Sequence, residues 1–198
     1  MHKGRLEAFS DGVLAIIITI MVLELHMPDG ADLTALQAAA PKLLTYLLSF
    51  VFIGIYWNNH HHMLQVTQRV NGAALWANMH LLFWLSLIPF VTDWMGEHFA
   101  PLPVAAYGVV LLASGTAYFI LSRVLLAAHG DDSVLARALS RDVKGVASLL
   151  IYTAAVVIAF FRPAFACALY VVVALLWLVP DRRIESLLEA EAAEHPND

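Results

Sequence analysis

Six apolar stretches of membrane-spanning length follow one another along this chain, and polar connections separate them. About 20 apolar residues cross the hydrocarbon core of a bilayer as a helix. The pattern predicts helices at roughly 5–26, 43–63, 72–93, 104–127, 145–161 and 164–180, of which the last two are short. Residues 33–40 can form a further short helix along the membrane surface. We therefore expect an all-α integral membrane protein with a transmembrane domain over 1–180 and an acidic tail over 181–198.

The composition supports the membrane prediction. The chain is 61% hydrophobic and 14% charged, with a mean hydropathy of +0.73, whereas soluble domains have about 45–50% apolar and about 25% charged residues. The formal charge of −5 arises largely from acidic residues near the C-terminus. No basic cluster with interleaved aromatic residues is present. The expected partner is the lipid bilayer, and nucleic acid is not expected.

The basic residues predict an orientation, because cytoplasmic loops of membrane proteins carry an excess of Lys and Arg. An even number of spans places both termini on the same side. One side then holds Lys3, Arg5, Arg69, Arg123, Arg137, Arg141, Lys144, Arg182 and Arg183, and the other holds only Lys42 and Arg162. We expect a multi-pass protein of the cell (plasma) membrane with cytoplasmic N- and C-termini.

The first span has two different faces. With about 100° between successive residues of a helix, Gly12, Ile16, Thr19 and Leu23 fall within about 60° of one another. Asp11 points about 110° away from the centre of that stripe. One face is therefore narrow, small or apolar, and carries a single hydroxyl group. The other carries a carboxylate that needs a protein partner.

Polar residues of three spans are expected at the same depth near the cytoplasmic end. The second span contributes a run of amides and imidazoles, and the third contributes Asn78 and His80. Burying such groups costs several kcal/mol unless they are paired or reach water. A carboxylate that accepts from imidazole N–H groups would be satisfied there and would fix the relative rotation of the helices. The predicted structural network comprises Arg5, Ser10, Asp11, His60, His61 and Asn78.

Other interpretations of these residues remain open. Adjacent histidines diverge by about 100° on a helix, so His60, His61 and His62 cannot all bind one metal, and we expect no metal site and no cofactor. A proton-coupled transporter or a membrane metalloenzyme that uses the His and Asp layer is the alternative function. The apolar stripe also has a packing interpretation, because Ile and Leu at helical spacing commonly pack and Thr commonly bonds to its own i−4 carbonyl.

Three motifs resemble those of the transmembrane protein 175 family, the endolysosomal potassium channels and their prokaryotic relatives. The pattern R-x-x-x-F-S-D on a first transmembrane helix is the most distinctive. The others are similar to W-x-x-H-H and to N-x-x-L-L leading to L-P-F, with Ile88 in place of the common Leu. The residues are Arg5, Phe9, Ser10 and Asp11, then Trp57, His60 and His61, then Asn78, Leu81, Leu82, Ile88, Pro89 and Phe90.

This resemblance implies a channel and not an enzyme: a six-helix subunit whose first helix lines the central pore of a homotetramer. Closed rotational symmetry would bring identical stripes to face one axis. Ile16 and Leu23 match the family's hydrophobic pore residues, Thr19 matches its pore threonine, and Ile20, about 70° from the stripe centre, is a borderline pore residue. Passive, leak-like conduction with potassium as the permeant ion follows from the resemblance alone.

In this arrangement Arg5 and Asp11 have supporting roles. Arg5 lies close to the stripe in angle, at the cytoplasmic mouth. Asp11 faces away from the axis and is predicted to meet His60 or His61 and Asn78. That contact would hold the first helix to the second and third.

Overall fold

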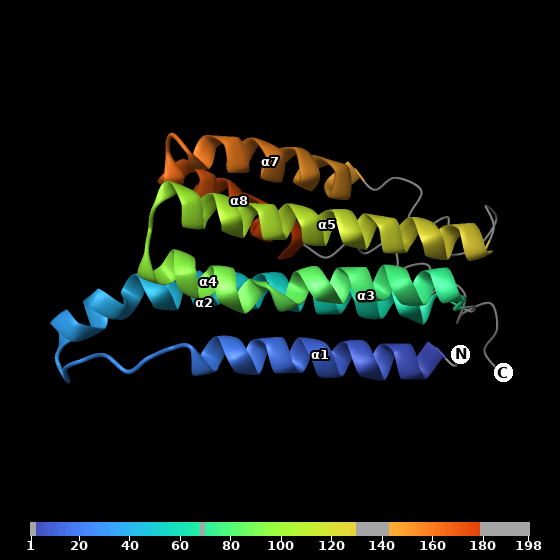
Figure 1. Cartoon of the computed structure of the whole chain (residues 1–198), viewed down its shortest axis with the longest axis horizontal. Coiled ribbons are helices and arrows are strands. Elements are labelled where there is room, and N and C mark those ends of the chain that lie inside the picture. The colour runs from blue at the N-terminus through green and yellow to red at the C-terminus, as the bar shows by residue number, and fades with distance from the viewer. Residues whose placement is uncertain (1–2, 68–69, 130–142, 179–198) are drawn as a thin grey trace.

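Helices make up all the regular secondary structure of the residues described by this computed structural model, 3–67, 70–129 and 143–178 (Figure 1). Four stretches are long and apolar enough to cross a membrane: Lys3–Leu23, Leu33–Gln65, Gly72–Glu97 and Pro101–Ala128. Two shorter apolar helices follow them. The elements are α1 (Lys3–Leu23), α2 (Leu33–Gln65), α3 (Gly72–Ser86), α4 (Ile88–Glu97), α5 (Pro101–His129), α7 (Val143–Ala159) and α8 (Pro163–Leu178). The all-α prediction is confirmed, and the acidic tail over 181–198 lies outside the described residues.

The second helix is longer than expected, because residues 33–40 continue into the span and do not form a separate helix. The Asp32 side chain caps α2 by accepting a hydrogen bond from the Ala35 backbone N–H at 2.9 Å. Pro41 lies inside α2, where its ring and missing N–H favour a bend. The first turns of α2 accordingly bend away from the rest of the helix (Figure 1).

The third span is divided into α3 and α4, which follow each other in nearly one line (Figure 1). Pro89 lies in the first turn of α4. It has no N–H to donate to the carbonyl group one turn earlier, and such a missing bond interrupts a helix. The two helices therefore meet at Leu87, within a single 26-residue apolar stretch.

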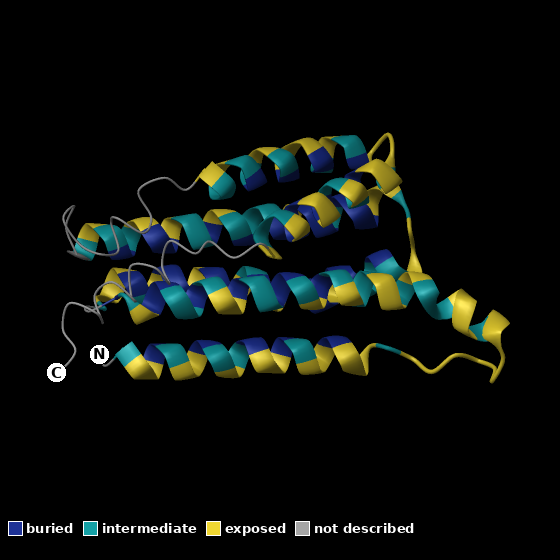
Figure 2. Ribbon diagram, turned by 180° about the vertical axis from the view of Figure 1, so that it is seen from behind, coloured by how far each residue is buried: buried dark blue, intermediate teal, exposed yellow. Residues whose placement is uncertain are grey.

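The first helix lies at one margin of the bundle, where it packs against α2, α3 and α4 (Figure 1). Its inner face is buried and its outer face is exposed (Figure 2). The buried residues of α1 are Leu6, Ser10, Leu14, Ile17 and Met21. Lipid tails are as apolar as these side chains, so packing and hydrogen bonds hold a membrane helix in place.

Polar side chains tie α2 to its neighbours at the end of the bundle opposite the N-terminus. The Lys42 ammonium lies 2.8 Å from an Asp93 carboxylate oxygen and 3.0 Å from a Glu97 oxygen, which links α2 to α4. Two turns further along α2, the buried Ser49 hydroxyl lies 2.6 Å from the Thr92 hydroxyl and 3.0 Å from that of Tyr107. These contacts fix α2, α4 and α5 relative to one another.

A glycine permits close approach of α5 to its neighbours. A Cβ atom at Gly108 would overlap the Tyr170 side chain and would lie 2.9 Å from Val156 Cγ2. The Tyr170 hydroxyl is itself fixed, because it donates a hydrogen bond to the Val104 carbonyl at 3.1 Å. Small residues commonly mark such contacts between membrane helices.

We expect Gly108→Ala to destabilise the protein by about 1–3 kcal/mol, because overpacking displaces a fixed side chain. Thermal unfolding in detergent, followed by loss of the folded peak in size-exclusion chromatography, measures the effect. Gly54→Ala is the matched control, since a Cβ at Gly54 has no neighbour within 4 Å. Equal melting temperatures for the two variants would contradict the predicted overlap.

Candidate functional site

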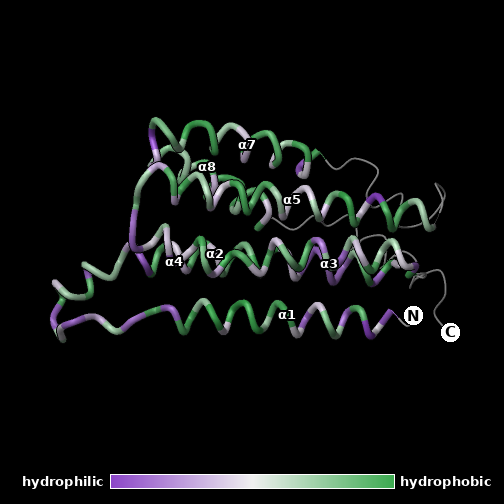
Figure 3. The backbone as a smooth tube through the Cα atoms, viewed as in Figure 1, coloured by the Kyte–Doolittle hydropathy of each residue, from purple (hydrophilic) through white to green (hydrophobic). Residues whose placement is uncertain are grey.

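The stripe of α1 that the sequence singles out is exposed in this structure. Ile16 is 59% exposed and Leu23 74% exposed, and Ile20, about 70° from the stripe centre, is 42% exposed. Gly12 and Thr19 are also exposed, and a Cβ added at Gly12 would have no neighbour within 4 Å. Apolar residues dominate the middle of this helix (Figure 3). The described residues thus leave an apolar face of α1 uncovered.

The hydroxyl group of Thr19 has a backbone partner. It donates to the Ala15 carbonyl at 2.8 Å, the i−4 bond that is common for Thr in membrane helices. A hydroxyl oxygen that donates still has acceptor capacity, and Thr19 is exposed. Its oxygen can therefore accept from water or contact a cation at the surface of α1.

Asn78 of α3 is the centre of the buried polar network. Its side-chain Nδ2 donates to the Ser10 hydroxyl of α1 at 3.0 Å, and its Oδ1 accepts from His60 Nε2 of α2 at 2.8 Å. Ser10 in turn donates to the Leu6 carbonyl at 2.8 Å. Ser10 and Asn78 are 0% exposed and His60 is 2% exposed. One amide therefore joins three helices in a site where unpaired polar groups would be costly.

Asp11 has a different partner from the one expected. Its Oδ1 accepts a hydrogen bond from the indole Nε1 of Trp57 at 3.1 Å, and the bond that reaches Asn78 from α1 comes from Ser10. Ser10 and Asp11 point about 100° apart on the helix, so the first faces α3 and the second faces α2. Asp11 is predicted from the sequence to contact a histidine and Asn78. In the structure Asp11 instead contacts Trp57 of α2, and its neighbour Ser10 contacts Asn78 of α3.

His61 also joins the network by a route that sequence reasoning missed. Its ring stacks on Trp57 with centroids 6.0 Å apart and an interplanar angle of 18°. Its Nδ1 lies 3.0 Å from a carboxylate oxygen of Glu7. Trp57 and His61 are four residues apart, a spacing that places them on one helical face. That spacing, together with the need of an indole N–H for an acceptor, could have predicted from the sequence that Trp57 and His61 face the acidic residues of α1 together.

The remaining polar residues near this level are arranged separately. Arg5 is exposed in the first turns of α1, at the same angle as the stripe. The exposed His80 accepts a hydrogen bond from Trp84 Nε1 on its own helix at 2.9 Å. In the described part of the chain, no group of three or more His, Cys, Asp or Glu side chains could hold a metal ion. The site thus consists of an exposed face of α1 and, behind it, the buried hydrogen bonds of Asn78 with Ser10 and His60 that hold α1 in place.

Comparisons with known proteins agree on one family. The sequence model of the endosomal/lysosomal potassium channel TMEM175 matches residues 5–89. The chain is 53% identical over 190 residues to a potassium channel of Chryseobacterium sp., an alignment that covers 96% of this chain and 99% of that relative. It is 34% identical over 96 residues to the human endosomal/lysosomal proton channel TMEM175, covering 42% of this chain and 19% of the human protein.

A solved structure has the same fold. It is the crystal structure of a lysosomal potassium-selective channel TMEM175 homolog from Chamaesiphon minutus, with a TM-score of 0.78 and 27% sequence identity. The match covers 89% of this chain and 96% of that chain. The residues matched by the family model include α1, α2 and α3, which carry the exposed stripe and the Asn78 network.

Proposed function

This chain belongs to the TMEM175 family, and from that premise we propose that it conducts potassium ions passively across a membrane. The potassium channel of Chryseobacterium sp. is similar over almost its whole length, so the comparison extends to all the described helices. The family consists of channels and not of enzymes. Potassium is the permeant ion of this proposal, and no cofactor takes part.

The proposed pore lies on the axis of a homotetramer, with α1 of each subunit facing that axis. The observation that carries this proposal is the exposed stripe of α1, in which Ile16 and Leu23 are 59% and 74% exposed. Closed symmetry would turn four such stripes inward. Ile16 and Leu23 would form apolar rings that exclude water when they are narrow, and Thr19 would place a ring of hydroxyl oxygens between them.

Residues beside the rings complete the proposed conduit. Gly12 lies one turn before Ile16 on α1. Because glycine has no side chain, the pore would be wide at the level of Gly12. Ile20 would lie at the edge of the conduit, and Arg5 at its mouth. The network centred on Asn78 and the bond from Trp57 to Asp11 would set the rotation of α1, so that the stripe faces the axis. One face of α1 would thus line the pore, and the other face, with Ser10 and Asp11, would hold the helix in position.

The proposed orientation places both termini in the cytoplasm and the protein in the plasma membrane. Among the described residues, Lys3, Arg5, Arg123 and Lys144 lie toward one end of the bundle and Lys42 and Arg162 toward the other. The excess of positive charge supports a cytoplasmic location for the first group.

Ion flux from the purified protein in liposomes tests the proposal. We expect potassium to move down its gradient faster than sodium, in a sample whose mass is four times that of one 21.8 kDa chain. Besides the potassium and sodium gradients, flux under a proton gradient is also measured, because the human relative is named a proton channel. Liposomes with verified tetramers but no potassium flux would contradict the proposal. A permeability to protons that far exceeds that to potassium would replace the proposed permeant ion.

A further inference from the structure

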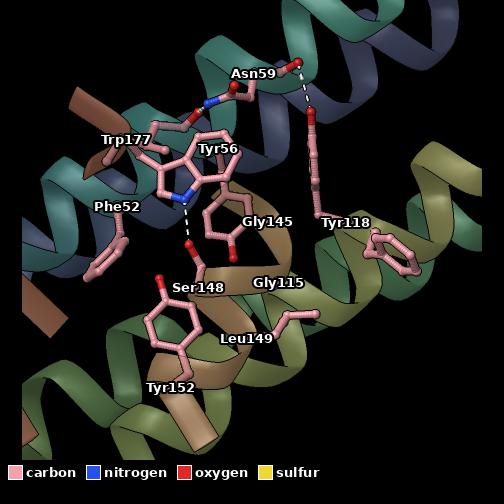
Figure 4. A pocket seen from close by; sticks show the side chains of 12 residues that line it. Phe52, Tyr56, Asn59, Gly115, Tyr118, Gly145, Ser148, Leu149, Tyr152 and Trp177 are labelled. Atoms are coloured by element: carbon pink, nitrogen blue, oxygen red, sulfur yellow. Dashed lines mark hydrogen bonds between the residues drawn. The ribbon is translucent and has the colours of Figure 1, made fainter. Parts of the chain in front are cut away.

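A cavity is lined by residues of α2, α5, α7 and α8 (Figure 4), and the last three of these helices lie on the side of the bundle away from α1 (Figure 1). Aromatic side chains form much of its wall, and none of the twelve residues that line it carries a charge. Gly115 of α5 forms part of the wall, and a Cβ atom there would lie 3.1 Å from Leu149 Cδ2 and 3.7 Å from the Tyr56 hydroxyl, so a methyl group would narrow the cavity. The cavity has a volume of about 50 Å³, several times the roughly 10–15 Å³ that one water molecule needs.

The hydroxyl groups of two tyrosines in this wall have no hydrogen-bond partner among the described residues. They belong to Tyr56 of α2 and Tyr152 of α7, which are 9% and 3% exposed. Both hydroxyl groups point into the space between the two helices (Figure 4). A hydroxyl group can donate one hydrogen bond and accept others. These two phenols can therefore bind a polar group that is placed between them.

Several other polar groups of the wall have hydrogen-bond partners. The Tyr118 hydroxyl donates to the Asn59 carbonyl at 3.2 Å. The indole N–H of Trp177 donates to the Ser148 hydroxyl at 2.8 Å, and Ser148 donates to the Lys144 carbonyl at 2.7 Å. Tyr56 and Tyr152 thus place two hydroxyl groups without a partner among the described residues at one place in a largely apolar wall.

We propose that this cavity binds a neutral lipophilic molecule that carries one alcoholic or phenolic hydroxyl group and reaches the site from the bilayer. The absence of charged lining residues selects against ions. The aromatic wall favours an apolar body, and the hydroxyl groups of Tyr56 and Tyr152 would bind the hydroxyl group of the ligand as donor and acceptor. The proposal goes beyond ion conduction and does not depend on it, because the cavity is separate from the exposed stripe of α1.

A diazirine-bearing octanol tests this binding site on the purified full-length protein in liposomes. Irradiation, proteolysis and mass spectrometry locate the residues that it labels. We expect adducts on the wall of the cavity, and excess unlabelled octanol should suppress them. The double variant Tyr56→Phe with Tyr152→Phe should reduce labelling about tenfold, because two hydrogen bonds are lost while the rings remain. Gly115→Ala should reduce it as well, by placing a methyl group in the space.

Matched variants separate binding from general disturbance. Tyr46→Phe removes a hydroxyl group on α2 outside the cavity, and Gly54→Ala adds a methyl group in open space; neither should change the labelling. Equal labelling of wild type and the phenylalanine double variant would overturn the proposal. So would adducts spread over the lipid-facing surface, or a cavity that holds water only and gives no suppressible adducts. If Gly115→Ala does not fold, the labelling of the Tyr56→Phe and Tyr152→Phe double variant alone tests the binding site. Potassium flux measured on the same liposomes shows separately whether the proposed conduction holds.

Discussion

Replacing Ile16 with asparagine is expected to raise potassium flux in liposomes about tenfold or more. Ile16 is 59% exposed on α1, so asparagine fits there without disturbing the core of the subunit. In the proposed tetramer four isoleucines would form an apolar ring that water leaves when the pore is narrow. Four amides would keep the constriction hydrated, and a barrier lowered by about 1.4 kcal/mol corresponds to a tenfold faster passage.

Val22→Asn is the matched control for this variant. Val22 is 46% exposed on the same helix, but it points about 90° away from the centre of the stripe. It should leave the flux close to that of the wild type. Unchanged flux in Ile16→Asn, with intact tetramers and a wild-type level of protein in the liposomes, would show that the ring of Ile16 is not the barrier. A similar increase in both variants would assign the effect to general loosening of α1.

Asn78→Ala is expected to lower the free energy of unfolding by about 2–4 kcal/mol and to reduce the yield of assembled protein. The substitution removes the bonds to Ser10 and His60 and leaves the imidazole of a 2% exposed histidine without its acceptor. Buried polar groups that lose a partner carry the full cost of desolvation. Thermal unfolding in detergent and the fraction of protein in the tetramer peak measure the result.

Two comparisons make the Asn78 prediction specific. Asn58→Ala removes an exposed amide from α2 and should shift stability by less than about 0.5 kcal/mol. Asp11→Ala removes a single bond from an exposed Trp57 and should cost about 1 kcal/mol. A smaller effect for Asn78→Ala than for Asp11→Ala would contradict the central position of Asn78. A well-assembled Asp11→Ala channel with altered ion preference would instead assign Asp11 to the pore.

Much of the helical framework could be predicted from the sequence, because the bilayer imposes a length on every apolar stretch. The extent of α2 could not, since Pro41 commonly ends a helix and so suggested that residues 33–40 form a separate one. The sequence pattern also left the break at Leu87 undetected. Whether a helix continues past a proline depends on whether neighbouring contacts support the bend. The pairing of Lys42 with Asp93 and Glu97 is such a contact. It joins residues that are 51 and 55 positions apart, so a local sequence pattern does not predict it.

By itself the sequence determined that α1 has two faces, because the angle between successive residues of a helix is fixed. It also placed Ser10, Asp11, His60 and Asn78 in one layer, because depth in the membrane follows from position along each span. Only the tertiary structure decided that Ser10 meets Asn78 and that Asp11 meets Trp57. Those contacts depend on how each helix is rotated and shifted against its neighbours, and side-chain packing along the whole bundle sets that rotation. The same packing leaves Tyr56 and Tyr152 facing a cavity, which no pattern along the chain indicates.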